Sequence, residues 1–84
     1  MINFIYLYND EGHPDYLMPI NRLLQIGTRK GRTHIYFENS YIQGSKKEDP
    51  HVFTLEESVV RIEAMLSRAT NSVLRLKYIT KEQA

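Results

Sequence analysis

The most distinctive polar segment of this 84-residue chain is Arg29-Lys30-Gly31-Arg32, which places three positive charges within four residues. It lies between two runs rich in β-branched and aromatic residues, a pattern typical of a short hairpin loop. Cations at a hairpin tip can bind phosphate groups, and a base can stack on Tyr36, which follows on the next predicted strand. The candidate anion or nucleic-acid contact therefore consists of Arg29, Lys30, Arg32 and His34.

The overall charge argues against nucleic acid as the main partner. Eleven Lys and Arg residues stand against ten Asp and Glu residues, a formal net charge of +1 at pH 7, whereas nucleic-acid-binding domains are usually strongly basic. Glu38 also shares the predicted strand face of His34 and Tyr36. The simpler interpretation of the basic segment is a solvated turn, and anion binding is the alternative.

Tyrosine is the second unusual feature, because the chain contains six Tyr and three Phe residues. One small core cannot enclose so many rings, since a domain of this size hides only about 60–65% of the surface of its unfolded chain. Tyrosine is common at interfaces because its ring is apolar and its hydroxyl tolerates water. We therefore expect a partner interface, although tyrosines lying on a solvated sheet surface are the alternative. The predicted interface residues are Tyr6, Tyr8, Tyr36 and Tyr41.

No motif in the sequence predicts catalysis or metal binding. The histidines are scattered, the serines have no neighbouring base, and no P-loop, dinucleotide fingerprint, HExxH or GxSxG motif occurs. The turn at 10–15 offers carboxylates and a histidine but lacks the distal Glu of a calcium loop. The absence of Cys excludes cysteine zinc sites, iron–sulfur clusters and thiol nucleophiles. We expect a non-enzymatic protein with no metal and no cofactor.

Composition also sets the class of protein. A hydrophobic share of 42% with almost balanced charge is typical of a folded domain and not of a disordered chain. No apolar run approaches the ~18–20 residues that a membrane span needs, and the N-terminal residues lack the basic start and cleavage site of a signal peptide. We expect one cytoplasmic domain over residues 1–84.

Apolar periodicity predicts the strands that position these residues. The almost continuously apolar segment Ile2–Tyr8 predicts a strand covered on both faces, by a helix and a neighbouring layer or by another subunit. A second strand begins at Tyr16, breaks near Pro19–Arg22 because proline cannot donate to a ladder, and resumes over Leu23–Thr28. A single helical turn at the break is the alternative. The alternation of apolar and polar residues is clearest over Thr33–Tyr41.

The second half of the chain predicts a loop, a helix and a last element for which the sequence allows three alternatives. Residues 43–50 contain no apolar side chain and predict an exposed loop. After a short strand at His51–Phe53, Thr54-Leu55-Glu56-Glu57 resembles a capping box, and apolar residues at three- and four-residue spacing predict an amphipathic helix over about 55–70. For residues 71–84, alternation favours an extra strand, with a longer helix or a loose tail as alternatives.

These elements predict an α+β fold, a small and mostly antiparallel sheet of about four to five strands with the helix packed on one face. Hairpin-length connections between the early strands favour antiparallel pairing, and the single amphipathic helix needs an apolar surface to cover. The partner contact would then be formed by the sheet face that carries Tyr6, Tyr8 and Tyr36, or by an edge strand that another chain can pair with.

Several short motifs, spread over about residues 1–66, carry a resemblance to a known family. They are Met1-Ile2, Asp10-Glu11-Gly12, Ile20-Asn21, Leu24-Gln25-Ile26, Thr33-His34-Ile35 and Glu57-Ser58-Val59-Val60. Together they resemble the FlbD-like family of small flagellar-operon proteins. A first loop with Pro14, a longer loop at 43–50 and the tail after Ala69 depart from the family pattern. The resemblance implies a shared topology and a small accessory or interaction protein without catalytic residues.

The sequence thus leaves three functions open. The leading expectation is a regulatory or accessory domain that acts through protein–protein contact, most simply as a homo-oligomer, by the sheet face that carries its tyrosines or by an edge strand. The alternative is a nucleic-acid, nucleotide or anion-binding module that uses the basic hairpin 29–32. A further alternative is a small phage- or plasmid-type inhibitor that occludes a larger complex, and its sequence would look no different from the first.

Overall fold

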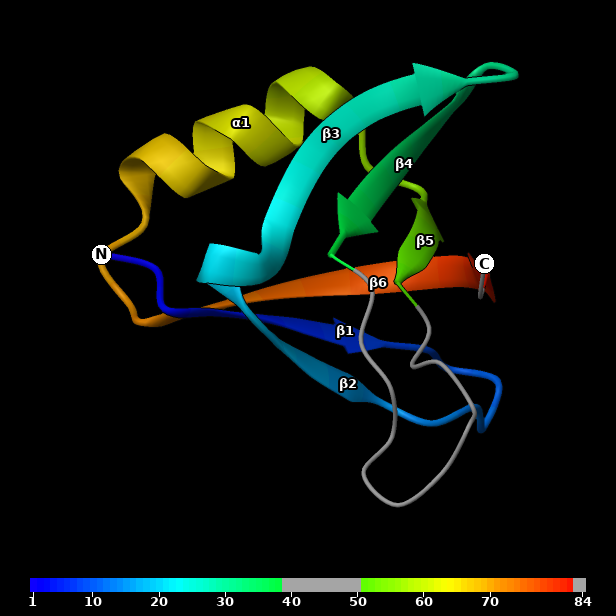
Figure 1. Ribbon diagram of the computed structural model, residues 1–84, viewed down its shortest axis with the longest axis horizontal. Helices are drawn as coiled ribbons and strands as arrows, with labels where there is room; N and C mark the ends of the chain where they lie inside the picture. The colour runs from blue at the N-terminus through cyan, green and yellow to red at the C-terminus, as the bar shows by residue number, and fades with distance from the viewer. Residues whose placement is uncertain (39–50, 83–84) are drawn as a thin grey trace.

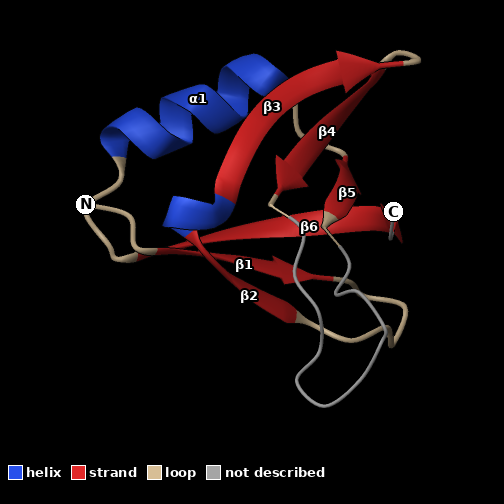
Figure 2. Ribbon diagram, viewed as in Figure 1, coloured by secondary structure: helices blue, strands red, loops and turns tan. Residues whose placement is uncertain are grey.

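The computed structural model describes residues 1–38 and 51–82. The predicted loop 43–50 and the predicted interface residue Tyr41 lie outside these residues. Figures 1 and 2 show the described elements, which are six strands, a short 3-10 helix and an α-helix. In chain order they are β1 (Phe4–Tyr8), β2 (Tyr16–Pro19), η1 (Ile20–Arg22), β3 (Leu23–Arg29), β4 (Arg32–Phe37), β5 (Val52–Leu55), α1 (Val59–Arg68) and β6 (Val73–Glu82).

The strands form a single sheet in the order β2-β1-β6-β5-β4-β3. The β1–β6 pair is parallel, and the other four pairs are antiparallel. The α+β class with one helix and a mostly antiparallel sheet is therefore confirmed for the described residues. The sheet differs from the prediction in having six strands in place of four to five and one parallel pair. The number rises because the broken second strand becomes two edge strands and because residues 73–82 form β6 at the centre.

Helix η1 connects β2 and β3, the two edge strands, and so brings the two edges of the sheet toward each other (Figure 1). Pro19 ends β2 at the edge, where its missing N–H removes no internal ladder bond. The Ile20 amide then donates to the Asn3 carbonyl over 2.8 Å, and the Glu38 amide donates to the Arg22 carbonyl over 2.7 Å. The predicted break is thus a single helical turn that curls the sheet around its core.

One cluster of buried side chains fills the inside of the curved sheet. Strand alternation directs Ile5 and Leu7 of β1 and Tyr78 of β6 into it. The Phe53 ring lies 5.5 Å from the Tyr78 ring and 6.0 Å from the Phe37 ring, measured between ring centres. The cluster consists of Ile5, Leu7, Met18, Ile35, Phe37, Phe53, Leu55, Ile62, Leu76 and Tyr78.

The β3–β4 hairpin turns through two residues with positive φ, Lys30 at 53° and Gly31 at 76°. Two consecutive left-handed residues are the mark of a type I′ turn, whose twist matches that of the flanking strands. Arg29 and Arg32 are directly opposite each other at the strand ends, so their side chains leave on the same side of the sheet. Residues 29–32 thus form the short hairpin loop that the sequence predicts.

Helix α1 begins later than the sequence predicts and spans Val59–Arg68 in place of about 55–70. Its N-cap is Ser58, whose hydroxyl oxygen accepts from the Arg61 amide over 3.2 Å. The predicted capping box is wrong because Thr54 belongs to β5, where it is paired with His34 of β4. Thr54 lies five residues before the first residue of the helix, so its hydroxyl is not at the position that caps the first turn.

Ile62 is the buried residue of α1 and has no exposed surface. Replacing Ile62 by Ala should lower the free energy of unfolding by about 2–5 kcal/mol, because the cavity forms between helix and sheet. The matched variant Val60→Ala, at a helix position that is 76% exposed, should change it by less than about 0.5 kcal/mol. Urea denaturation followed by circular dichroism measures both values, and equal losses would contradict this packing.

Candidate functional site

Tyr6 and Tyr8 project from β1 on the side opposite the core, and Arg75 joins them. Residues two apart on a strand share a face, and the two rings lie 6.4 Å apart with 26° between their planes. Arg75 of β6 is paired with Tyr6, and its guanidinium lies 4.5 Å from the Tyr6 ring centre and 5.7 Å from that of Tyr8. Such cation–π contacts contribute about 0.5–1 kcal/mol each at exposed sites. The three side chains therefore hold one another in place on the surface.

Two exposed apolar side chains extend this cluster. Leu17 of β2 is paired with Tyr6 and is 54% exposed, and Phe4, two residues before Tyr6, is 37% exposed. Cross-strand partners and residues two apart point to the same side of a sheet. We call the surface formed by Phe4, Tyr6, Tyr8, Leu17 and Arg75 the tyrosine face.

The loop between β1 and β2 gives the tyrosine face an acidic rim. Asp15 accepts a hydrogen bond from the Tyr6 hydroxyl, and this bond raises the pKa of Tyr6. Asp10 forms an ion pair with Lys77 at 2.7 Å, and its hydrogen bond raises the pKa of that lysine. In the part of the chain that the structure describes, no carboxylate pairs with Arg75. The face thus carries one unpaired cation beside several acids.

Tyr36, the third tyrosine of the predicted interface, lies on another part of the sheet. Its ring is 6.2 Å from that of His34 on β4. In register, Tyr36 is opposite Val52, which is opposite Glu82 at the end of β6. Because Arg75 precedes Glu82 by seven residues, the tyrosine face and Tyr36 are separated by roughly 20 Å along β6. The structure therefore brings Tyr6 and Tyr8 together and leaves Tyr36 apart.

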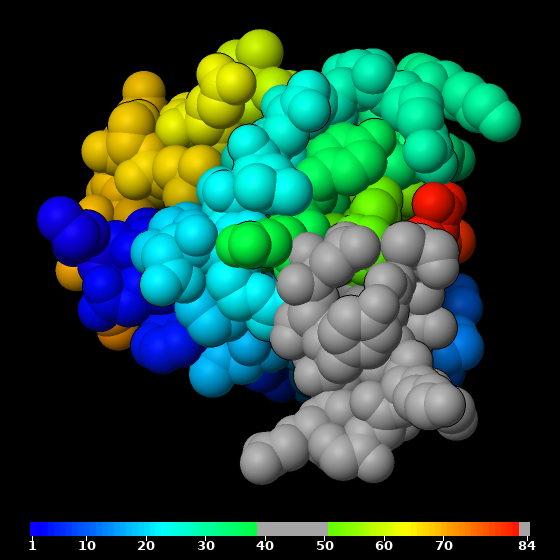
Figure 3. All heavy atoms as spheres, viewed as in Figure 1, coloured from blue at the N-terminus to red at the C-terminus, as the bar shows by residue number. Residues whose placement is uncertain are grey.

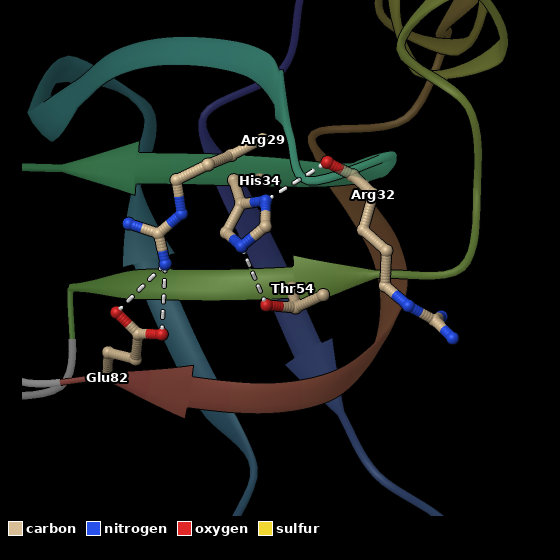
Figure 4. A network of polar contacts seen from close by, with 5 residues as sticks. All are labelled: Arg29, Arg32, His34, Thr54 and Glu82. Atoms are coloured by element: carbon tan, nitrogen blue, oxygen red, sulfur yellow. Dashed lines mark hydrogen bonds and ion pairs between the residues drawn. The ribbon is translucent and has the colours of Figure 1, made fainter.

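The three cations of the basic hairpin do not act as one cluster. Arg29 reaches across β4 and β5 to Glu82 of β6, with 3.2 Å between nitrogen and oxygen (Figure 4). The Arg32 side chain points away from this ion pair (Figure 4), and Lys30 lies in the turn. Within residues 1–38 and 51–82, neither Lys30 nor Arg32 has a carboxylate partner. The hairpin therefore has one paired cation and two unpaired ones.

His34 is 5% exposed and uses both ring nitrogens within the sheet. Its Nδ1 lies 3.0 Å from the Arg32 carbonyl oxygen and its Nε2 lies 3.1 Å from the Thr54 hydroxyl (Figure 4). A carbonyl only accepts, so Nδ1 carries a proton and, in the neutral ring, Nε2 accepts from the hydroxyl of Thr54. His34 therefore links β4 to β5 and presents no free nitrogen in this arrangement.

Comparison of the chain with protein-family models, with curated proteins and with solved structures found no match. The resemblance to the FlbD-like family therefore stays a prediction. The described residues contain no group of three or more His, Cys, Asp or Glu side chains placed to hold a metal ion. None of their helices is long and apolar enough to span a membrane.

Sequence reasoning missed Arg75, Leu17 and Phe4 as members of a site. The signal that could have found Arg75 is the alternation of residues 73–79, which places Leu74 and Leu76 on one face of the strand and Arg75 on the other. Nothing local indicates that this strand lies parallel to β1, and that pairing is what places Arg75 on the tyrosine rings.

Tyr78 holds the loop that supplies the acidic rim. Its hydroxyl, on a side chain that belongs to the core, donates to the Pro14 carbonyl over 2.6 Å. The Asn9 side-chain amide donates to the Tyr78 carbonyl over 2.9 Å. Burial raises the pKa of Tyr78, because a phenolate loses its hydration inside the protein. The position of the rim is thus set from the core.

Replacing Tyr78 by Phe should lower the free energy of unfolding by about 1–2 kcal/mol near neutral pH, because the Pro14 carbonyl loses its donor. The pKa of Tyr78 is higher in the folded protein than in the unfolded chain, so the stability it contributes is lost as the pH rises above about 10. The variant has no Tyr78 hydroxyl to ionise, so it does not lose this stability at high pH. The free energies of unfolding of the wild type and the variant should therefore converge as the pH rises. Urea denaturation from about pH 7 to about pH 11 measures them, and parallel curves would refute the linkage.

Proposed function

We propose that the protein is a non-enzymatic interaction domain and that a second copy of the chain docks on its tyrosine face. The observation that carries this proposal is the surface cluster of the half-buried Tyr6 and Tyr8 with the exposed Arg75, and with the exposed Leu17 beside it. Tyrosine and arginine are enriched among the residues that contribute most to binding at protein interfaces. Because these side chains already hold one another in the free chain, docking would cost little additional side-chain conformational entropy.

The charges of the tyrosine face favour a second copy as the partner. In a two-fold contact the same surface is used by both copies. A residue of one copy that contacts a second residue of the other copy has this contact repeated with the roles of the copies exchanged, so the surface must complement itself. Arg75 has no carboxylate partner among the described residues, while Asp10, Glu11 and Asp15 lie in the loop at the rim. We place the two-fold axis between Arg75 and the acidic loop, so that Arg75 of each copy faces the acidic loop of the other.

The two other functions have less support from the geometry. Of the residues predicted to contact nucleic acid, Arg29 is paired with Glu82 and His34 is buried, which leaves Lys30 and Arg32. An inhibitor of a larger complex would use the same tyrosine face but would be monomeric on its own. The resemblance to the FlbD-like family is compatible with an accessory role of either kind.

Light scattering should give a mass near twice the 9.9 kDa of one chain at high protein concentration. Leu17→Glu and Arg75→Glu should each shift the protein to the monomer, because the first buries an unpaired charge in the contact and the second opposes the acidic loop. Each change should raise the dimer dissociation constant by at least about tenfold.

Leu24→Glu is the matched control, because Leu24 is also an exposed leucine, at 67%, on the other edge strand. It should leave the dimer unchanged, and circular dichroism checks that all three variants are folded. A wild-type protein that is monomeric at every concentration would overturn the proposal, as would equal effects of Leu17→Glu and Leu24→Glu.

A further inference from the structure

An open groove lies between the tip of the β3–β4 hairpin and the start of α1, with a volume of about 450 Å³. The hairpin tip projects from the body of the molecule (Figure 3). The hairpin contributes Lys30, Arg32 and Thr33 to the lining, and the connection from β5 to α1 contributes Glu56 and Ser58. None of these residues belongs to the tyrosine face, so the groove is a separate surface.

The Thr33 hydroxyl is the feature of the groove that points to a ligand. Thr33 is 7% exposed and lines the groove. Among the described residues nothing forms a hydrogen bond with its hydroxyl, whereas the equally buried Thr54 hydroxyl meets the His34 ring. Buried polar groups are almost always hydrogen-bonded, because an unpaired one destabilises the fold. A hydroxyl of this kind at a groove wall is suited to donate to a ligand oxygen.

The charged side chains make the groove attractive to an anion. Lys30 and Arg32 have no carboxylate partner in the described segments, and Glu56 contributes the single carboxylate of the lining. The neighbouring carboxylate of Glu57 is held by Arg61 at 2.7 Å. The lining side chains therefore have a net positive charge.

The start of α1 adds directed N–H donors. The Arg61 amide donates to the Ser58 hydroxyl, and the Ile62 amide donates to the Ser58 carbonyl over 3.0 Å. The amides of Val59 and Val60 precede these bonds and have no acceptor within the helix. They lie at the positive end of the helix dipole, which favours an anion.

We propose that this groove binds a phosphate dianion, either free or as the monoester of a small molecule. The Thr33 hydroxyl and the first amides of α1 donate to the phosphate oxygens, and Lys30 and Arg32 balance the charge. A nucleic-acid backbone needs a longer track of cations, but the next cation along the hairpin, Arg29, is held by Glu82. The site is therefore suited to one phosphate group.

An NMR titration of the ¹⁵N-labelled protein tests the proposal with two probes, inorganic phosphate and methyl phosphate. Saturable shifts of the amides of Gly31, Thr33, Val59 and Val60 are expected with inorganic phosphate. Equal or tighter binding of methyl phosphate identifies a monoester as the ligand class, and binding of inorganic phosphate alone identifies free phosphate. Both outcomes support the site.

Three substitutions should weaken binding by about tenfold or more, since each removes a charge or a donor from the ligand. Lys30→Asn suits the left-handed turn, Arg32→Gln removes the second cation, and Thr33→Val keeps the shape of the side chain. Arg29→Gln is the matched control in the same hairpin and should weaken binding by less than about threefold, because its charge is already paired and distant charges are screened. Glu56→Gln should strengthen binding, a gain that misfolding cannot produce.

The spectrum of each variant without phosphate checks that the hairpin is folded. The proposal is overturned if the wild type shows no saturable shift below about 10 mM phosphate, because even a weak site with a dissociation constant near 1 mM would be largely filled at that concentration. It is also overturned if Arg29→Gln and Thr33→Val weaken binding equally, or if a single-stranded oligonucleotide binds and both phosphate probes do not.

Discussion

Strand β6 lies between β1 and β5 and forms ladders with both, parallel to the first and antiparallel to the second. It joins residues 4–8 to residues 73–77, from opposite ends of the described chain. Such a pairing forms only after a long loop has closed, and through it the β2–β1 pair joins strands β5, β4 and β3 in one sheet. Leu76 and Tyr78, each 2% exposed, are the side chains by which β6 fills that core.

The same pairing decides what the outer surface presents. Alternate residues of a strand point to opposite faces, so the register that buries Leu76 also places Arg75 over Tyr6 and Tyr8. A shift of one residue would exchange the two sets of side chains. The core and the proposed docking face therefore both follow from one strand register. Tyr78 is a second link between them, because its side chain belongs to the core and its hydroxyl holds the acidic loop at the rim of the face.

The far end of β6 has a comparable effect on the basic hairpin. The type I′ turn places Arg29 and Arg32 opposite each other, and Glu82, which is 53 residues further along the chain, pairs with Arg29 alone. Lys30 and Arg32 are left beside the groove at the start of α1. The distribution of free charge at the hairpin tip thus depends on where β6 ends. An exposed pair of this kind contributes little stability, but it determines which cations a ligand meets.

Local patterns in the sequence were sufficient for the features whose causes are local. The alternation of Thr33–Phe37, the turn at residues 29–32 and the amphipathic spacing after Val59 each depend on neighbours a few residues away, and each corresponds to an element of the fold. The α+β class follows from those elements.

Contacts between distant segments were decided only by the tertiary structure. Thr54 fits a helix cap by its spacing, but pairing with His34 draws it into β5, and Ser58 becomes the cap. Tyr6, Tyr8 and Tyr36 have similar local surroundings, and only the strand order shows that Arg75 lies with the first two and not with the third. Strand order and register depend on the apolar surface that the whole core buries, and no short segment determines that by itself.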